Sequence, residues 1–536
     1  MRKIWIYISS VCLLTVGGCT KHFDAINTDP TQASASVYDP NLLLPTAELG
    51  YMSAIQGYSG PLLFQSMWVQ TFASAEFPSY YSNGDKYVAS GNINTYDASI
   101  WNDAYTAAGQ AYSIQSLIKT QKDASLGNLN GIALIVQLLN LELVTDTYGD
   151  CPYTQALQAA SGVTEPVYDA QQSIYSSMLA KLDSVIPTLS ASSTLPGNDI
   201  IYKGNIAQWQ KFGYSLMLRM AMRLTKADPT TAQSYAEKAY AGGTFASNAD
   251  NAYVTFDHAD GYQNGNASAL VVPEDYVEVR WGKILIDYLK TNNDPRLSVI
   301  AEVPQAGLAN AGNTSLAGVS TPAAQNGMPN GYDENGGATD ISAAPGYPGP
   351  TGTGGDVNPT GNYSRPTTSL YLALNTPGYI LTYAETELLL AEAAARGWNV
   401  GATASVHYAN GLAAALQSYG VFNGTTPISA GTATAYAAAH PLDISSQANS
   451  LTMINTQFWV TTGTLFNFAE AWNNWRRSGI PALTPVNYAA NFTGGVIPRR
   501  EIYPTTESAT NPGNYKQAVS GLSGGDTWVS HVWWDK

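Results

Sequence analysis

Charged side chains are scarce in this chain. Asp, Glu, Lys and Arg make up 12% of its 536 residues, about half of the roughly 25% found in average soluble domains. Gly, Ser, Thr, Asn and Tyr take their place, a composition typical of extracellular surfaces. The formal net charge is −15 at pH 7. A surface of this sign repels phosphate backbones, so the composition argues against a nucleic-acid partner.

Cysteine is nearly absent as well, with three residues in the whole chain. Cys12 lies in a segment that we expect to be removed, and Cys19 lies at the expected lipid site, so only Cys151 is left. We therefore predict no intramolecular disulfide bond, even though the chain carries an export signal.

Long apolar runs and the motifs of common metal and cofactor sites are missing. After Cys19 no run reaches the roughly 18 apolar residues that a membrane-spanning helix needs. The sequence has no H-E-x-x-H, no P-loop and no paired Cys/His array, and its five histidines are scattered. We therefore predict neither a metal ion nor a cofactor.

One catalytic pattern does occur, because residues 521–525 match G-x-S-x-G. This pattern activates serine only at a tight strand-to-helix turn, with an acid and then a histidine further along the chain. Only eleven residues follow it, so we interpret it as a flexible turn and predict no catalytic residue. A pair of glycosidase-type carboxylates is left open, because acidic residues are plentiful and no local motif marks such a pair.

The N-terminal segment has the features of a lipoprotein signal. Arg2 and Lys3 are followed by an apolar stretch, and Gly17 and Gly18 precede Cys19. We predict a signal peptide over 1–18, a lipid on Cys19 and a polar tether over 19–40, which would anchor the chain to a membrane without crossing it. The alternative is an ordinary signal peptide that is cleaved elsewhere.

Apolar residues recur at helical spacing from residue 41 onward, and strand-like alternation is rare. The clearest helical segments are 131–148, 168–187, 206–224, 379–396 and 465–478. These predict a mostly α fold of helical hairpins with little β structure, in a single domain over 41–536. Gly, Pro, Asn, Thr and Ser dominate an excursion at about 306–367, and loops of this length are usually functional or disordered.

Several unusual strings occur in a fixed order along the chain. They are FDAINTDP at 23–30, LRMAMR at 218–223, DPRL at 294–297, TYAE at 382–385, EAWNNWRRSGIP at 470–481, PRR at 498–500 and WWD at 533–535. With this ordered set the chain, from Cys19 to its end, resembles the SusD/RagB family of nutrient-binding outer-membrane lipoproteins. The first string is similar to the SusD-like branch described as starch-binding associated.

The resemblance implies about four TPR-type helical hairpins that form a superhelical half, together with a loop-rich irregular half. It also implies a non-enzymatic protein, lipid-anchored in the outer membrane and facing the cell surface, which delivers an oligosaccharide to a SusC-type TonB-dependent transporter. A peptide ligand of the RagB kind is the near alternative. Two further alternatives are an all-α surface glycoside hydrolase and a structural surface protein without a ligand. Cys151 stands where the family usually has an aliphatic residue, so we expect a buried, inert thiol.

Charged residues on the predicted helices suggest buried ion pairs. Arg219 and Arg223 are one helical turn apart, and Glu385 and Glu392 are two turns apart, so each pair lies on one helix face. Because buried charges need partners, we predict that these arginines, or Arg476 and Arg477, pair with the two glutamates between helices. Core packing is the prediction for four tryptophans in helical patterns, Trp101, Trp209, Trp472 and Trp475.

Ligand contacts are expected from aromatic residues on loops, because the apolar faces of sugar rings lie against aromatic rings while their hydroxyls need polar partners. One candidate group lies between 77 and 96 and comprises Phe77, Tyr80, Tyr81, Asn83 and Tyr87. A second group comprises Tyr262, Tyr276, Arg280 and Trp281. The excursion adds Tyr332, Asn335, Tyr347 and Tyr363.

Overall fold

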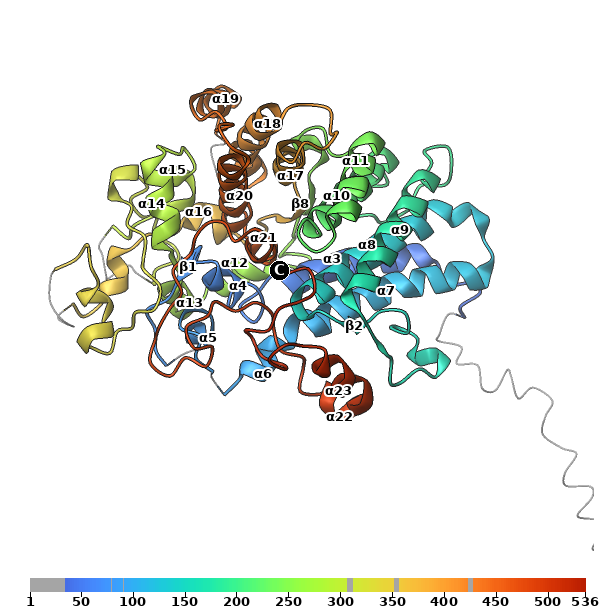
Figure 1. Ribbon diagram of the computed structural model, residues 1–536, viewed down its shortest axis with the longest axis horizontal. Coiled ribbons are helices and arrows are strands. Elements are labelled where there is room, and N and C mark those ends of the chain that lie inside the picture. The colour runs from blue at the N-terminus through green and yellow to red at the C-terminus, as the bar shows by residue number, and fades with distance from the viewer. Residues whose placement is uncertain (1–33, 79, 90, 306–311, 351–355, 423–427) are drawn as a thin grey trace, which may run out of the picture.

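The computed structural model describes residues 34–536 except 79, 90, 306–311, 351–355 and 423–427, so the signal peptide, Cys19 and most of the tether lie outside the described residues. Helices dominate, and the longer ones form one body across the right and upper parts of Figure 1. The body contains α3 (Leu44–Ile55), α7 (Ser99–Gln121), α8 (Gly127–Tyr148), α9 (Gln171–Val185), α10 (Ile206–Arg223), α11 (Pro229–Gly242), α17 (Tyr383–Ala395), α18 (Ala404–Gln417), α19 (Ala430–Ala439), α20 (Gln447–Thr464) and α21 (Phe468–Ser478).

Consecutive helices of the body pack in pairs. The pairs are α7 with α8, α10 with α11, α17 with α18 and α20 with α21, which agrees with the prediction of about four helical hairpins. Helix α8 is buried along most of its length because α3, α7, α9 and α10 cover it. It is long and apolar enough to cross a membrane, the one such helix among the described residues, but most of its apolar window is buried inside the protein.

Three of the predicted helices begin later in the structure than the apolar pattern suggested, and the one predicted over 168–187 begins at Gln171. The segment predicted over 379–396 starts as strand β8 (Gly378–Leu381), and the helix begins at Tyr383. Thr382 sets this boundary, because its side chain accepts a hydrogen bond from the backbone of Glu385 and caps the helix. The segment predicted from 465 begins as a helix only at Phe468, where Asn467 is the cap.

The predicted ion pairs between helices are confirmed. Arg219 Nε lies 2.6 Å from Glu385 Oε1, and Arg477 Nη1 lies 2.6 Å from Glu392 Oε1. The structure adds Glu470, which accepts from Arg223 at 2.8 Å. Burial alone would raise the pKa of Glu470, but the guanidinium groups of Arg223 and Arg219 outweigh it and lower that pKa to about 2. These three glutamates are therefore held by arginine partners inside the helical core.

Short elements and long connections make up the other half, on the left and lower sides of Figure 1. Its helices are α4 (Gln65–Trp68), α5 (Tyr81–Asp85), α6 (Ile93–Asp97), α12 (Gly265–Leu270), α13 (Pro273–Glu278), α14 (Lys283–Thr291), α15 (Leu297–Ile300), α16 (Thr368–Tyr371), α22 (Glu507–Thr510) and α23 (Pro512–Ser520). Its strands, with β8, form four two-stranded antiparallel pairs: β1 (Phe72–Ala73) with β5 (Arg280–Trp281), β2 (Cys151–Pro152) with β3 (Tyr168–Asp169), β4 (Ala252–Val254) with β8, and β6 (Ala301–Glu302) with β7 (Arg365–Pro366).

The Gly/Pro-rich excursion folds back onto the loop-rich half. Its short 3₁₀ turns include Gly337–Thr339, Ile341–Ala343 and Pro359–Asn362. A small separate core forms where Met328, Ile341 and Tyr363 pack against Ala73 and Ala75. This packing gives the described parts of the excursion an ordered structure.

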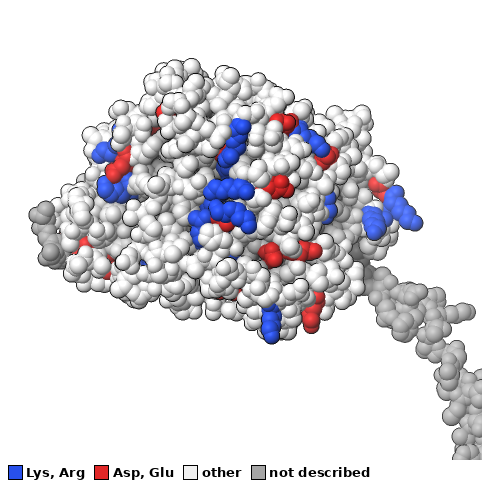
Figure 2. All heavy atoms as spheres, in the orientation of Figure 1, with Lys and Arg blue, Asp and Glu red and all other residues white. Residues whose placement is uncertain are grey.

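The surface is mostly uncharged, as the composition predicted. Figure 2 shows one face on which Lys and Arg side chains gather near the centre, around the C-terminus marked in Figure 1. There Lys226 Nζ donates to the carbonyl oxygen of Lys536 at 3.3 Å. Cys151 is buried as expected, and burial raises the pKa of its thiol to about 12, so it stays a neutral thiol at physiological pH.

Candidate ligand-binding site

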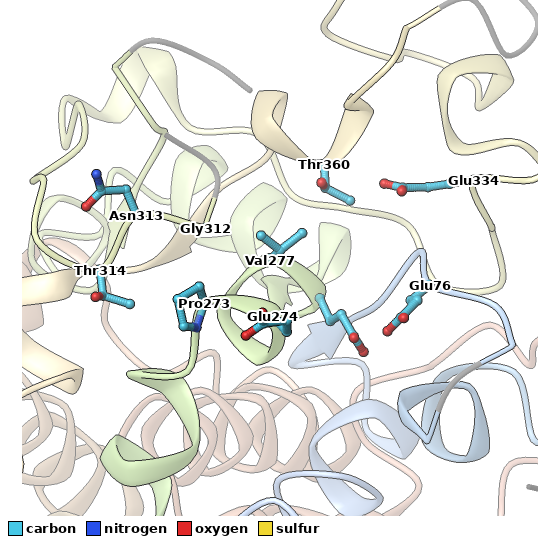
Figure 3. A pocket seen from close by; sticks show the side chains of 10 residues that line it. Glu76, Pro273, Glu274, Val277, Gly312, Asn313, Thr314, Glu334 and Thr360 are labelled. Carbon is cyan, nitrogen blue, oxygen red and sulfur yellow. The ribbon is translucent and has the colours of Figure 1, made fainter. Parts of the chain in front are cut away.

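A cavity of about 710 Å³ lies where three distant segments of the loop-rich half meet (Figure 3). Glu76 comes from the chain after β1. Helix α13 contributes Pro273, Glu274, Val277 and Glu278, and the excursion contributes Gly312, Asn313, Thr314, Glu334 and Thr360. The β1–β5 pair, which joins residues 72–73 to 280–281, brings the segments before Glu76 and after α13 together, but none of the nine predicted contact residues lines this cavity.

Helix α13 supplies one wall of the cavity. Pro273 begins this short helix, where its missing N–H costs no hydrogen bond. Glu274 and Glu278 are one turn apart, so both lie on the same face. Gly312 allows the excursion to approach, because a Cβ atom there would lie 2.8 Å from Val277 Cγ2. A larger residue at 312 would push the two walls of the cavity apart.

Glutamate dominates the charge of the cavity. Four of its ten described lining residues are glutamates, and none of the ten is lysine or arginine. Burial raises the pKa of Glu334, and the nearby Arg280 guanidinium offsets part of that rise. Arg280 lies behind the wall, where its Nε donates to the Thr360 carbonyl oxygen at 2.9 Å. The lining is therefore strongly negative on the side that faces solvent.

Thr360 places a hydroxyl group in the wall of the cavity. The residue is 2% exposed, and its Oγ1 has no hydrogen-bond partner among the described residues. In Figure 3 the side chain of Glu334 extends towards Thr360, and this hydroxyl offsets part of the rise that burial causes in the pKa of Glu334. A buried hydroxyl without a hydrogen-bond partner costs free energy, so the oxygen of Thr360 is available to accept a hydrogen bond from a bound molecule.

Partly exposed aromatic rings lie next to α13. Tyr80 donates from its hydroxyl to Asp275 Oδ1 on that helix, and its ring centroid lies 5.8 Å from that of Tyr58. Tyr58 is 46% exposed. The sequence analysis missed this residue, although its position in the turn-forming string Gly57–Tyr58–Ser59–Gly60 was a usable indication of an exposed ring.

Six of the nine predicted contact residues are buried, so their expected exposure on loops is wrong. They are Tyr81, Asn83, Tyr87, Tyr276, Arg280 and Trp281. They are buried because segments distant in the sequence pack over them. The Tyr276 hydroxyl donates to the Pro366 carbonyl, and the Trp281 indole donates to the Ile300 carbonyl. These side chains hold the walls of the loop-rich half together.

Phe77, Tyr80 and Tyr262 keep partial exposure. Phe77 packs beside Tyr488 with ring centroids 5.2 Å apart, and Tyr80 contacts α13 as described. Tyr262 is 38% exposed and lies in an isolated bridge with Asp257, but it does not line the cavity. The first two remain candidates for ligand contact at this cavity, and Tyr262 remains a candidate for contact elsewhere.

The excursion residues predicted alongside them take separate places. Tyr332 lines a second cavity, of about 660 Å³, with Gln70 and Asn330. Asn335 donates to the Phe77 carbonyl oxygen at 3.0 Å, and Tyr363 is buried in the small core. The residues that line the main cavity, Glu334 and Thr360 among them, gave no signature in the sequence because no motif marks them.

Within the described part of the chain, no group of three or more His, Cys, Asp or Glu side chains converges closely enough to hold a metal ion. The four glutamates of the cavity thus surround a space and do not share one point. Such a lining can bind an extended ligand by many weak polar contacts.

Comparison with known proteins identifies the relatives of the chain. The model of the SusD-like family described as starch-binding and associating with the outer membrane matches residues 33–504. Among solved structures, a chitin-binding protein is 30% identical with a TM-score of 0.77, and the match covers 93% of this chain and 100% of that one. A search of curated proteins gives no match.

More distant structures share the fold. A chitin-binding SusD homologue from Flavobacterium johnsoniae is 22% identical with a TM-score of 0.71, over 92% of this chain and 98% of that one. A SusD-like protein from Bacteroides thetaiotaomicron is 23% identical with a TM-score of 0.71, over 93% and 99%. The mostly helical fold with TPR-type hairpins is thereby confirmed.

Proposed function

The chain belongs to the SusD-like family, described as starch-binding and associating with the outer membrane, and from this premise we propose that it binds an oligosaccharide at the cavity beside α13. It works without catalysis. It hands its ligand to a SusC-type TonB-dependent transporter, the partner expected from the sequence resemblance. The predicted lipid on Cys19 holds it to the outer membrane with its binding face towards the outside.

The observation that supports this proposal most is the pairing of a polar cavity with exposed aromatic rings. Tyr58 and Tyr80 offer flat apolar surfaces against which the C–H faces of a sugar ring can pack. Asn313, Thr314 and the glutamates offer partners for sugar hydroxyls. Recognition of an uncharged glycan needs both kinds of surface close together.

Chitin oligosaccharides are the first ligands that we propose. The relative that is 30% identical over nearly the whole chain is described as chitin-binding, and a more distant one carries the same description. The family description points to starch, so maltooligosaccharides are the natural comparison.

Isothermal titration calorimetry with the purified chain tests the proposal. N-acetylglucosamine hexamers and maltohexaose are titrated separately, and the products are analysed after long incubation. We expect binding of at least one glycan and no shortened products. Shortened products would favour the hydrolase alternative, and binding confined to peptides would favour the RagB-like alternative.

The Tyr58→Ala variant locates the site. We expect it to weaken glycan binding about fivefold to tenfold, which corresponds to about 1 kcal/mol for one aromatic contact. Tyr240→Ala is the matched control, because Tyr240 is 37% exposed on α11, outside the loop-rich half. Equal losses in both variants would place the ligand elsewhere.

Anchoring and partnership need separate measurements. Radiolabelled palmitate should label the wild-type chain in cells, and the Cys19→Ser variant should remain unlabelled. Affinity purification of the lipidated chain from outer membranes should recover a TonB-dependent transporter. Recovery of the chain without such a transporter would contradict the delivery role.

A further inference from the structure

The negative charge of the cavity lining indicates the chemical class of the ligand more specifically than membership of the family does. Glu76, Glu274, Glu278 and Glu334 all line it, and the ten described lining residues include no lysine or arginine. Two buried arginines lie behind the lining: Arg280 donates to the Thr360 carbonyl oxygen, and Arg365 donates to the Asn313 carbonyl oxygen and pairs with Glu302 at 2.8 Å. A lining of this sign raises the local concentration of cations and repels anions. A neutral glycan can donate hydrogen bonds to these carboxylates, but it gains nothing from the attraction between opposite charges.

A divalent metal ion is a poor explanation for these glutamates. Calcium needs six to eight oxygen ligands at 2.3–2.6 Å from one point, and the described residues contain no group of acidic side chains that meets around one point. The carboxylates are instead distributed around about 710 Å³ of space. This arrangement fits a ligand whose positive charges are spaced along its length.

Thr360 provides an independent sign of a ligand. Its hydroxyl is almost fully buried, lies in the cavity wall and makes no hydrogen bond of normal geometry among the described residues, although it is close enough to Glu334 to lower the pKa of that carboxyl. The Glu334 side chain extends towards it in Figure 3. An ammonium group carries three donors and no acceptor, so one ammonium placed between these two residues could donate to both oxygens.

We propose that the cavity prefers an oligosaccharide that carries free amino groups, such as a deacetylated amino-sugar oligomer, over its N-acetylated counterpart. This inference rests on the proposed glycan-binding function and names the substrate class of the same site. The aromatic rings beside α13 contact the sugar faces, and the glutamates face the protonated amines. A basic peptide would lack the sugar faces that such rings can pack against.

Calorimetry at pH 6 compares two β-1,4-linked hexamers of equal length, one fully N-acetylated and one fully deacetylated. We expect the deacetylated hexamer to bind about tenfold more tightly, since two weak carboxylate–ammonium contacts together give roughly this factor. This advantage should shrink in 0.5 M NaCl because salt screens exposed charge pairs. The affinity of the N-acetylated hexamer should change little with salt.

The Glu274→Gln/Glu334→Gln double variant tests the residues. It should remove most of the preference for the deacetylated hexamer, because its affinity for that hexamer should fall much further than its affinity for the N-acetylated hexamer. The matched control is Glu165→Gln/Asp260→Asn, which removes the same charge from two exposed residues that do not line the cavity. The control should retain the preference. Thr360→Val, which replaces the hydroxyl by a methyl group, should weaken binding of the deacetylated hexamer about threefold or more.

The outcomes separate the two levels of the proposal. Equal binding of both hexamers at both salt concentrations overturns the amine preference and leaves glycan binding intact. Binding of neither hexamer overturns both. Tri-lysine that binds as tightly as the deacetylated hexamer overturns the assignment to a sugar. Equal loss of preference in the cavity variant and in the control variant overturns the assignment to this cavity.

Discussion

The helical core and the lining of the cavity hold acidic side chains in opposite ways. In the body Glu385, Glu392 and Glu470 are buried and lie within 2.8 Å of arginine nitrogens on neighbouring helices. Around the cavity Glu274 and Glu334 are exposed, and no lysine or arginine shares the described lining with them. One set of carboxylates joins helices, whereas the other faces solvent and an incoming ligand.

The difference between these two sets of carboxylates follows from their exposure to water. A carboxylate taken out of water needs a partner, and removal of that partner costs several kcal/mol. An exposed carboxylate is hydrated and screened, so its loss hardly changes folding. The same residue type is therefore structural in the helical core and available for binding at the cavity.

The largest expected effect comes from Glu385→Ala. It leaves the Arg219 guanidinium buried without its closest partner, so we expect unfolding free energy to fall by about 3–5 kcal/mol. Thermal and urea unfolding measure this, and Glu274→Ala is the control, with an expected change within about 0.5 kcal/mol. Similar losses in the two variants would remove the contrast between the helical core and the cavity.

An intermediate effect is expected at Glu501, which is buried and makes no salt bridge among the described residues, although Arg476 and Arg500 offset part of the rise in its pKa. It accepts from Gln65 Nε2 at 2.5 Å and from the Tyr148 hydroxyl at 3.0 Å. Burial raises its pKa from 4.5 to about 8 despite these hydrogen bonds. Between pH 4.5 and 8 the unfolded chain releases this proton while the folded chain keeps it, so this group makes stability fall as pH rises.

The Glu501→Gln variant removes that titration. Relative to wild type, the unfolding free energy of the variant should increase by on the order of 2 kcal/mol when the pH is raised from 5 to 8. Only wild type has a buried carboxyl that makes the fold less stable as the pH rises. Urea unfolding at the two pH values gives the difference. Asp97 lies in the same buried group, and its pKa is also raised by burial, so part of the pH dependence should persist. An unchanged dependence in the variant would show that Glu501 is ionised in the fold.

The smallest effect is expected from Tyr80→Phe. The change removes the donor to Asp275 but keeps the ring beside Tyr58, so unfolding free energy should fall by about 1 kcal/mol. Glycan affinity should fall a few-fold as α13 loses its support. Tyr262→Phe provides the control, since no hydrogen bond of its hydroxyl is found in the structure. A loss of affinity without a loss of stability would instead mean that the Tyr80 hydroxyl contacts the ligand directly.

Residues with strong local patterns were predicted well. The helix predicted over 131–148 begins four residues earlier in the structure, as Gly127–Tyr148, and ends at the same residue. The pairing of Arg219 with Glu385 followed from helical spacing and the need of buried charges for partners. The strand Gly378–Leu381 was missed, because a short apolar run next to a helix has no period that separates the two.

The binding site was predicted only as a region. Phe77 and Tyr80 lie at the site, but Tyr276 and Trp281, which look equally exposed in the sequence, are buried under β7 and α15. Tyr58 was missed although it is the most exposed ring of its group. Exposure depends on which distant segments cover a residue, and nothing local to the residue encodes that.

The sequence by itself determined the helical body, the lone buried thiol and the family to which the chain belongs, since periodicity and ordered strings are properties of neighbouring residues. Only the tertiary structure decided where the glutamates of the cavity meet. Glu76, Glu274 and Glu334 are separated by long stretches of chain, and they share a space because the β1–β5 pair and the close approach at Gly312 bring their segments together.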